Sequence, residues 1–164
     1  MNINFEELKE LYIDFDEYLR KVEKINGIIV TYEDQRIPLF VELGELLNEF
    51  PTKFKYWRQS AKDNRDNGLE EFADCLNFIF AEMSFSDLKS IKMNLDIMTE
   101  IFIKDNNDIY YNIYSIIVSC KRNPISQFYN LIAIGYKLGF TWEEIYNASK
   151  NKIKIINERL DNEY

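Results

Sequence analysis

The apolar residues at the start of the chain recur every three or four positions, which is the spacing of one face of an α-helix. Within residues 3–25 this face consists of Phe5, Leu8, Leu11, Tyr12, Phe15, Tyr18, Leu19, Val22 and Ile25. Similar runs follow along the chain, and only five glycines and three prolines occur among its 164 residues. We therefore expect an all-α fold, a helical bundle of about six to seven helices that forms a single domain over residues 1–164.

Turn residues set the expected limits of the first two helices. The first should end at Asn26-Gly27. The second should run from Tyr32 or Ile37 to Phe50, because a proline follows and the residue before proline disfavours the helical conformation.

A long charged segment, residues 51–68, should follow as a loop, closed by a turn at Asp66-Asn67-Gly68. A loop of this length usually carries a function. The later helices are expected at about residues 69–83, 84–104, 106–121, 124–139 and 141–159. Ser84 or Ser86 should begin the second of these helices, Pro124 the fourth and the capping box at Thr141 the fifth. The fourth should end at Gly139 in the left-handed conformation.

The charge balance and the residue inventory exclude several classes of function. A net charge of −8 argues against electrostatic binding to a nucleic-acid polymer. No signal-peptide pattern and no run of apolar residues long enough for a membrane span is present, and the spacing of Cys75 and Cys120 fits reduced thiols. We therefore expect a cytoplasmic protein without a membrane partner.

The chain contains no histidine. Histidine bases, histidine-containing zinc sites and the Glu-x-x-His pairs of di-iron bundles are thus excluded. Acid–base and metal chemistry must fall to aspartate and glutamate.

The segment VELGELLNEF, residues 41–50, carries three carboxylates on one side of a helix. At 100° per residue Glu42, Glu45 and Glu49 fall within a sector of roughly 60°, opposite a leucine-rich face. A solvated acidic face would explain this helix when it is considered alone.

A second pair, Glu71 and Asp74, makes a solvated face a poor explanation, because it lies on a helix that is apolar around most of its circumference. The two helices can lie antiparallel and oppose Glu-x-x-Glu to Glu-x-x-Asp. Four partly buried carboxylates need cations, and an all-oxygen ligand set suits Mg²⁺ or Mn²⁺. The chemistry that follows is metal-assisted attack of water on a polyphosphate.

The segments VELGELLNEF, FKYW and LEEFADCLNF, in this order and spacing, resemble the dimeric all-α dUTPases of bacteria, their phages and kinetoplastids, within the all-α NTP pyrophosphatase group. The resemblance continues near the end of the chain in LGFTWEEI, Lys152 and Arg159. Residues 84–130 resemble the family only as a helical segment.

The resemblance implies a homodimer that hydrolyses a nucleoside triphosphate, most simply dUTP, to the monophosphate and pyrophosphate. It implies that two or three Mg²⁺ ions are held by Glu42, Glu45, Glu71 and Asp74, with Glu49 as a possible further ligand. Either of the first two glutamates would hold or deprotonate the attacking water. The substrate contacts implied are phosphate contacts from Lys55, Lys152 and Arg159, a base contact from Trp57 and a nucleoside or carboxylate contact from Asn48.

The departures from the family pattern fall on the residues that recognise the nucleoside. Phe15 lies near the position where the family has a base-contacting glutamine, and Asn77 replaces the family's histidine. In the last helix Ile153 and Ile156 are apolar, and the family pattern has an amide in place of Ile156. An amide such as Asn77 could still recognise a pyrimidine. Three readings remain open: a dUTPase with a rearranged base pocket, a pyrophosphatase for another pyrimidine nucleotide such as dCTP, or a relative with weak turnover that acts as a binding or regulatory protein.

Overall fold

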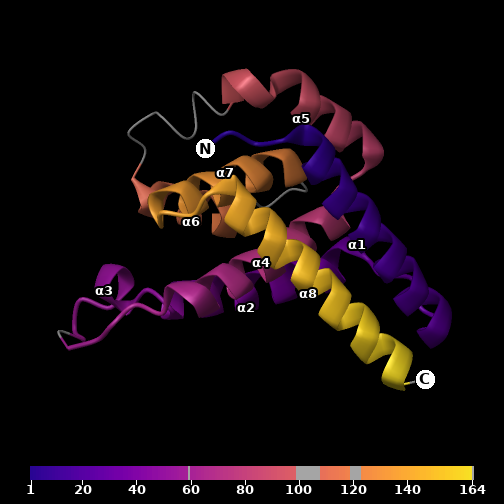
Figure 1. The fold of residues 1–164 in the computed structure, drawn as a ribbon, viewed down its shortest axis with the longest axis horizontal. Coiled ribbons are helices and arrows are strands. Elements are labelled where there is room, and N and C mark those ends of the chain that lie inside the picture. Colours follow the sequence, from indigo (N-terminus) through magenta and orange to yellow (C-terminus); the bar gives the residue numbers. More distant parts are fainter. Residues whose placement is uncertain (59, 99–107, 119–122, 164) are drawn as a thin grey trace.

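Eight helices account for the regular structure of the described part of the chain. The computed structural model describes residues 1–58, 60–98, 108–118 and 123–163. Within these ranges the all-α fold class is confirmed, with one helix more than expected, because a short helix forms inside the predicted loop. The helices are α1 (Phe5–Asn26), α2 (Tyr32–Asn48), α3 (Pro51–Phe54), α4 (Arg65–Glu82), α5 (Phe85–Met98), α6 (Ile109–Val118), α7 (Pro124–Lys137) and α8 (Trp142–Glu163) (Figure 1).

Most helix ends follow the signals in the sequence. Gly27 and Gly139 both have positive φ angles, 63° and 85°, which glycine adopts without steric cost. Ser84, and not Ser86, caps α5, because its hydroxyl accepts a hydrogen bond from the backbone N–H three residues later (3.3 Å). The Thr141 capping box is confirmed, since Glu144 Oε2 accepts from the Thr141 N–H at 2.8 Å.

The turn predicted at Asp66-Asn67-Gly68 is wrong, because these residues form the first turn of α4. Asn64 caps the helix, and its Oδ1 accepts a hydrogen bond from the Asn67 N–H (3.4 Å). Gly68 has a packing role, because a Cβ atom at this position would clash with the ring of Phe50. The glycine permits close packing here and does not mark a turn.

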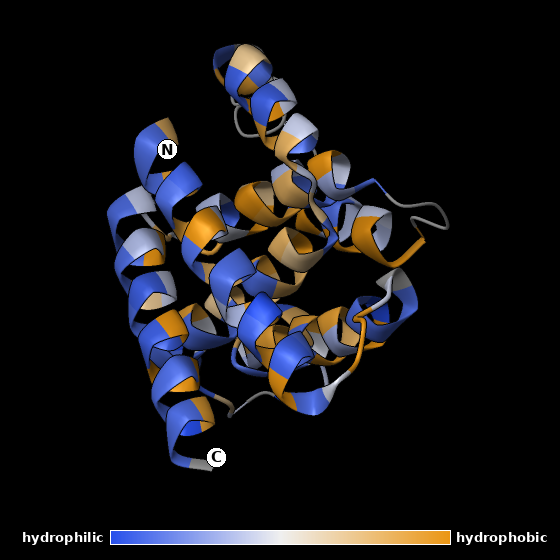
Figure 2. Ribbon diagram, turned by 90° about the vertical axis from the view of Figure 1, so that its right-hand side faces the viewer, coloured by the Kyte–Doolittle hydropathy of each residue, from blue (hydrophilic) through white to orange (hydrophobic). Residues whose placement is uncertain are grey.

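The helix α4 lies at the centre of the fold and contacts α1, α2, α7 and α8. Its buried side chains include Phe72, Leu76 and Ile79, none of which is accessible to solvent. Figure 2 shows hydrophobic residues gathered toward the middle of the bundle and hydrophilic residues on the outer faces of the peripheral helices. The central position of α4 therefore agrees with the sequence pattern, which is apolar around most of this helix.

Two helix pairs position the residues of interest. The helices α1 and α8 lie side by side in parallel, linked by Lys150 to Glu10 (2.8 Å) and by Lys21 to Asn157 (3.1 Å). The chain reverses through α3, so α4 returns antiparallel to α2 (Figure 1). The backbone N–H of Asn64 donates to the Glu49 carbonyl (2.8 Å) and closes this turn.

Several predictions fall outside the described residues. These are the helix end near Lys104, the start at Asn106, the end at Lys121 and the state of Cys120. Cys75 is buried and not in a disulfide. None of the described helices combines the length and the apolar composition that crossing a bilayer requires.

Candidate metal centre

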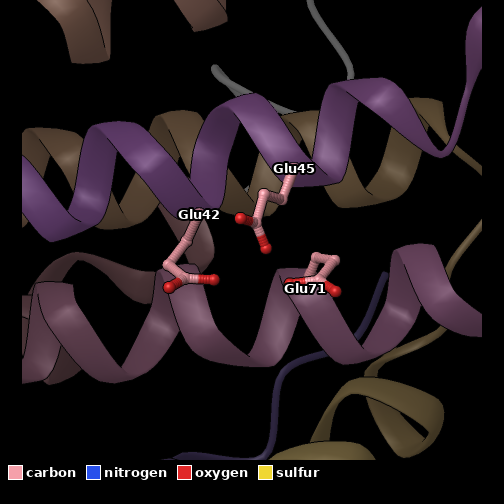
Figure 3. A group of neighbouring side chains, drawn as sticks. All are labelled: Glu42, Glu45 and Glu71. Carbon is pink, nitrogen blue, oxygen red and sulfur yellow. The ribbon is translucent and has the colours of Figure 1, made fainter.

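Three glutamates from two helices meet between α2 and α4. Glu42 and Glu45 lie one turn apart on α2, and Glu71 faces them from α4 (Figure 3). Each offers a carboxylate oxygen within 4.8 Å of those of the other two. Glu42 and Glu71 are partly buried and Glu45 is exposed. The antiparallel packing of two helices with carboxylates at i and i+3 thus forms a cluster open to solvent on one side, which we call the three-glutamate cluster.

Repulsion between carboxylates dominates the electrostatics of the three-glutamate cluster, and the charge of Lys152 offsets it only in part. Burial, followed by repulsion from Asp74, Glu45 and Glu71, raises the pKa of Glu42 to about 7. Burial and the charges of Asp74 and Glu45 also raise the pKa of Glu71, although the charge of Lys152 and a hydrogen bond with Glu42 offset part of the rise. Carboxylates that resist ionisation side by side are stabilised when a cation joins them. Their all-oxygen donor set fits Mg²⁺ or Mn²⁺.

Asp74, predicted as the fourth ligand, is placed beside the cluster and pairs with a lysine. Its Oδ2 lies 2.5 Å from Nζ of Lys152 on α8, and the two side chains are 15% and 24% exposed. Burial raises the pKa of Asp74 despite this partner. Burial alone would lower the pKa of Lys152, but its hydrogen bond with Asp74 and the neighbouring carboxylates raise it. The two residues therefore form a charged pair beside the three glutamates.

A cavity of about 330 Å³ borders Asp74 on the side of α1 and α8. We call it the Asp74 cavity. Its walls are largely apolar, and Phe15, Asn77 and Ile156, three of the four positions that depart from the family pattern, line it. Ile153, the fourth, is a core residue only 4% exposed. Three of the four departures therefore gather at one place in the fold.

Asn77 is the unusual polar residue of the Asp74 cavity. Its side chain is 3% exposed, and its Oδ1 has no hydrogen-bond partner. Such an unpaired buried oxygen has a free-energy cost of about 1–3 kcal/mol. A ligand that donates a hydrogen bond to it would remove that cost.

Sequence reasoning missed two polar residues that line the same cavity, Asp34 and Gln35. Asp34 is held by the α2 cap, where its Oδ2 accepts from the Thr31 hydroxyl at 2.7 Å. Gln35 is 7% exposed. A start of α2 at Tyr32, one of the two starts considered, would have placed Asp34 and Gln35 in the first helical turn.

The other predicted site residues of α2 and of the segment that follows it are not part of the three-glutamate cluster. Asn48 is the last residue of α2 and is exposed, and Glu49 follows it as the partly buried C-cap. Lys55 is the partly buried C-cap of α3. Trp57 is 65% exposed and contacts the ring of Tyr56, with centroids 5.0 Å apart. Trp57 is therefore not part of the core of this chain.

Arg159 lies on α8, two turns beyond Lys152, and is exposed. Both side chains border an open hollow of about 450 Å³ between α4 and α8. The hollow also contains the carboxylates of Asp66, Glu70 and Glu144. The structure thus brings together five of the predicted ligand and phosphate-binding residues, which are Glu42, Glu45, Glu71 and the pair of Asp74 with Lys152, and leaves the others at the periphery.

Comparison with known proteins supports the resemblance seen in the motifs. A family model described as dUTPase matches residues 4–164, which is nearly the whole chain. No curated protein gives a significant match. The family model covers both helices of the three-glutamate cluster and the last helix with Lys152. The chain therefore belongs to the all-α dUTPase family.

Proposed function

We propose that this protein is a Mg²⁺-dependent nucleoside triphosphate pyrophosphatase whose main substrate is dUTP, which it converts to dUMP and pyrophosphate. The observation that carries the proposal is the three-glutamate cluster, found between α2 and α4 of a chain that a dUTPase model matches. Family membership supports nucleotide hydrolysis, and the cluster supplies a place for the cation that such a reaction needs.

The residues divide the work according to their exposure. Bound Mg²⁺ would lower the pKa of water and neutralise charge that develops on the phosphate oxygens. Glu42 and Glu71, which are partly buried, would hold the cation site together with Asp74. Glu45 is exposed, so it is well placed to orient the attacking water and accept its proton, with Glu42 as the alternative base. Water then forms the new P–O bond while pyrophosphate leaves.

Basic residues would hold the triphosphate. Lys152 lies closest to the carboxylates, and Arg159 follows on the same helix. Lys55, at the end of α3, is the third candidate. Trp57 and Asn48 remain predicted nucleoside contacts, and Glu49 remains a predicted additional ligand.

The Asp74 cavity would hold the nucleoside, because it shares Asp74 with the metal side and is otherwise apolar. The unpaired Oδ1 of Asn77 would accept a hydrogen bond from the ligand. The same amide makes dCTP the second candidate substrate. The Asn77 N–H₂ group can donate to a carbonyl oxygen of uracil, and after rotation of the amide its oxygen can accept from the exocyclic amine of cytosine. The homodimer, the single domain and the cytoplasmic location stay predictions.

The test is a panel of dNTPs and NTPs incubated with Mg²⁺, with the products separated by chromatography. The proposal predicts dUMP and pyrophosphate from dUTP, with dCTP as the next best substrate. A folded protein that binds Mg²⁺ and nucleotides but turns over none of them would instead support a binding or regulatory role.

A further inference from the structure

Lys152 occupies a place at Asp74 that a metal ion would need. Its Nζ lies 2.5 Å from Asp74 Oδ2, and the pair joins α8 to α4. Both side chains are mostly buried, at 24% and 15% exposure, so solvent screens the contact only partly. This is therefore a strong contact and not a surface ion pair.

The pair also accounts for the separation of Asp74 from the three-glutamate cluster. Glu42, Glu45 and Glu71 form a group of three ligand atoms, and Asp74 is not a member of it. Of the four carboxylates, Asp74 is the one that forms an ion pair within the described part of the chain, and its partner is Lys152. The ammonium group thus supplies the cationic contact that the site has in this structure.

An ammonium group and a divalent cation compete for the same carboxylate oxygen, because their charges repel at short distance. Lysine is suited to leaving, since its charge sits at the end of a flexible four-carbon chain. The 450 Å³ hollow that borders Lys152 gives the side chain room to turn.

We propose that Lys152 is a placeholder cation. It pairs with Asp74 while the site is free of metal, leaves when Asp74 joins the three glutamates around a divalent cation, and then becomes available to the triphosphate. Its final position rests on the proposed function, whereas its release requires only that these carboxylates bind a divalent cation and does not depend on nucleotide hydrolysis. The consequence is an order of binding in which the cation prepares the site for the nucleotide.

The direct test is the chemical reactivity of the lysine amines. Protein is labelled briefly with limiting acetic anhydride, and modification is quantified by mass spectrometry without metal, with Mg²⁺ alone, and with Mg²⁺ plus a nonhydrolysable dUTP analogue. Lys152 should react several-fold faster with Mg²⁺ alone and more slowly again when the analogue is added. Lys150 is the internal reference, because it is on the same helix and pairs with Glu10 and Asp14, outside the cluster.

The second test measures metal affinity. Lys152→Met should bind Mg²⁺ on the order of tenfold more tightly at pH 8, because the competing charge is gone, even though it binds nucleotide less well. Lys154→Met is the matched control, since Lys154 is exposed and pairs with Glu158. Unchanged or weaker metal binding by Lys152→Met would overturn the proposal.

The outcomes separate this inference from the proposed function. If dUTP is hydrolysed while Mg²⁺ leaves the reactivity of Lys152 unchanged, the placeholder role is wrong and the enzyme assignment stands. If Mg²⁺ increases the reactivity of Lys152 but no nucleotide is turned over, the placeholder role stands and the enzyme assignment fails. Absence of Mg²⁺ binding contradicts both.

Discussion

Glu42 and Glu71 bring carboxylate oxygens within 4.8 Å of each other from two different helices. Such an approach is unfavourable for two ionised groups unless a proton or a cation lies between them. Burial and the neighbouring carboxylates raise the pKa of both residues, to about 7 for Glu42, so each holds a proton more tightly than an ordinary glutamate does. On the proposed function, a bound cation would displace protons from these carboxylates, and the first two predictions follow from this exchange.

Removing one glutamate should weaken the metal site without harming the fold. Glu71→Gln keeps the size of the side chain but removes a ligand and a repelling charge. We expect Mg²⁺-dependent kcat to fall by about a hundredfold or more, and the metal-free Tm to stay equal or rise. Steady-state kinetics and thermal unfolding with EDTA measure both. Glu33→Gln, on the exposed first turn of α2, is the control that should keep its activity. A marked loss of metal-free stability in Glu71→Gln would contradict the exchange.

The stability of the metal-free protein should depend on pH through Glu42. Its pKa is raised from 4.5 to about 7, so the folded state binds the proton more tightly than the unfolded state. The stabilisation is complete below about pH 4.5 and is lost as the pH rises through 7. With EDTA present, Tm should therefore fall between pH 6 and pH 8, and Mg²⁺ affinity should rise over the same interval.

Glu42→Gln should flatten this dependence of Tm on pH, because it removes the titrating group. Glu17→Gln, on the exposed side of α1, should leave it in place. Differential scanning fluorimetry across the pH series is sufficient. An identical slope in wild type and Glu42→Gln would show that another group is responsible.

Asn77 should set the choice of base. We expect Asn77→Leu to lower kcat/KM for dUTP by about tenfold, since the ligand loses one hydrogen bond in a buried site. Asn77→Asp presents acceptors only, so it should shift the ratio of dCTP to dUTP turnover toward dCTP, whose exocyclic amine is a donor. Ile156→Leu, a volume-conserving change in the same cavity, is the control and should alter the ratio little. A ratio that does not change in Asn77→Asp would place Asn77 away from the base.

Two glycine substitutions should have opposite effects on stability. A Cβ at Gly135 would lie 2.7 Å from the buried ring of Phe72, so Gly135→Ala should cost about 1–3 kcal/mol. A Cβ at Gly44 meets nothing within 4 Å, and Gly44→Ala in the middle of α2 should stabilise the protein by about 0.5–1 kcal/mol. Urea denaturation without metal compares them, and equal effects would contradict the packing described around α7.

The sequence was sufficient for features that depend on local signals. Helical periodicity predicted the all-α class, and the residues that end or begin a helix, such as Gly27, Gly139 and Thr141, act within one turn of the chain. The opposition of Glu42 and Glu45 to Glu71 was also predictable, because a reversal after α2 forces two amphipathic helices to pack face to face.

Long-range packing explains what the sequence did not reveal. The sequence around Gly68 predicts a turn, and only the packed structure shows that the ring of Phe50 lies against this glycine. The pairing of Asp74 with Lys152 spans 78 positions, and no local pattern distinguishes it from a solvated lysine. The gathering of Phe15, Asn77 and Ile156 around one cavity likewise needs three helices in place.

The most direct test of the central claim is the release of pyrophosphate from dUTP by the purified protein, followed in parallel for wild type and Glu45→Gln with Mg²⁺ or EDTA. We predict equal amounts of dUMP and pyrophosphate from the wild type, dependence on Mg²⁺, and loss of turnover in a folded Glu45→Gln. Turnover that continues undiminished in Glu45→Gln or in EDTA, or no turnover of dUTP by folded wild type with Mg²⁺, would contradict it.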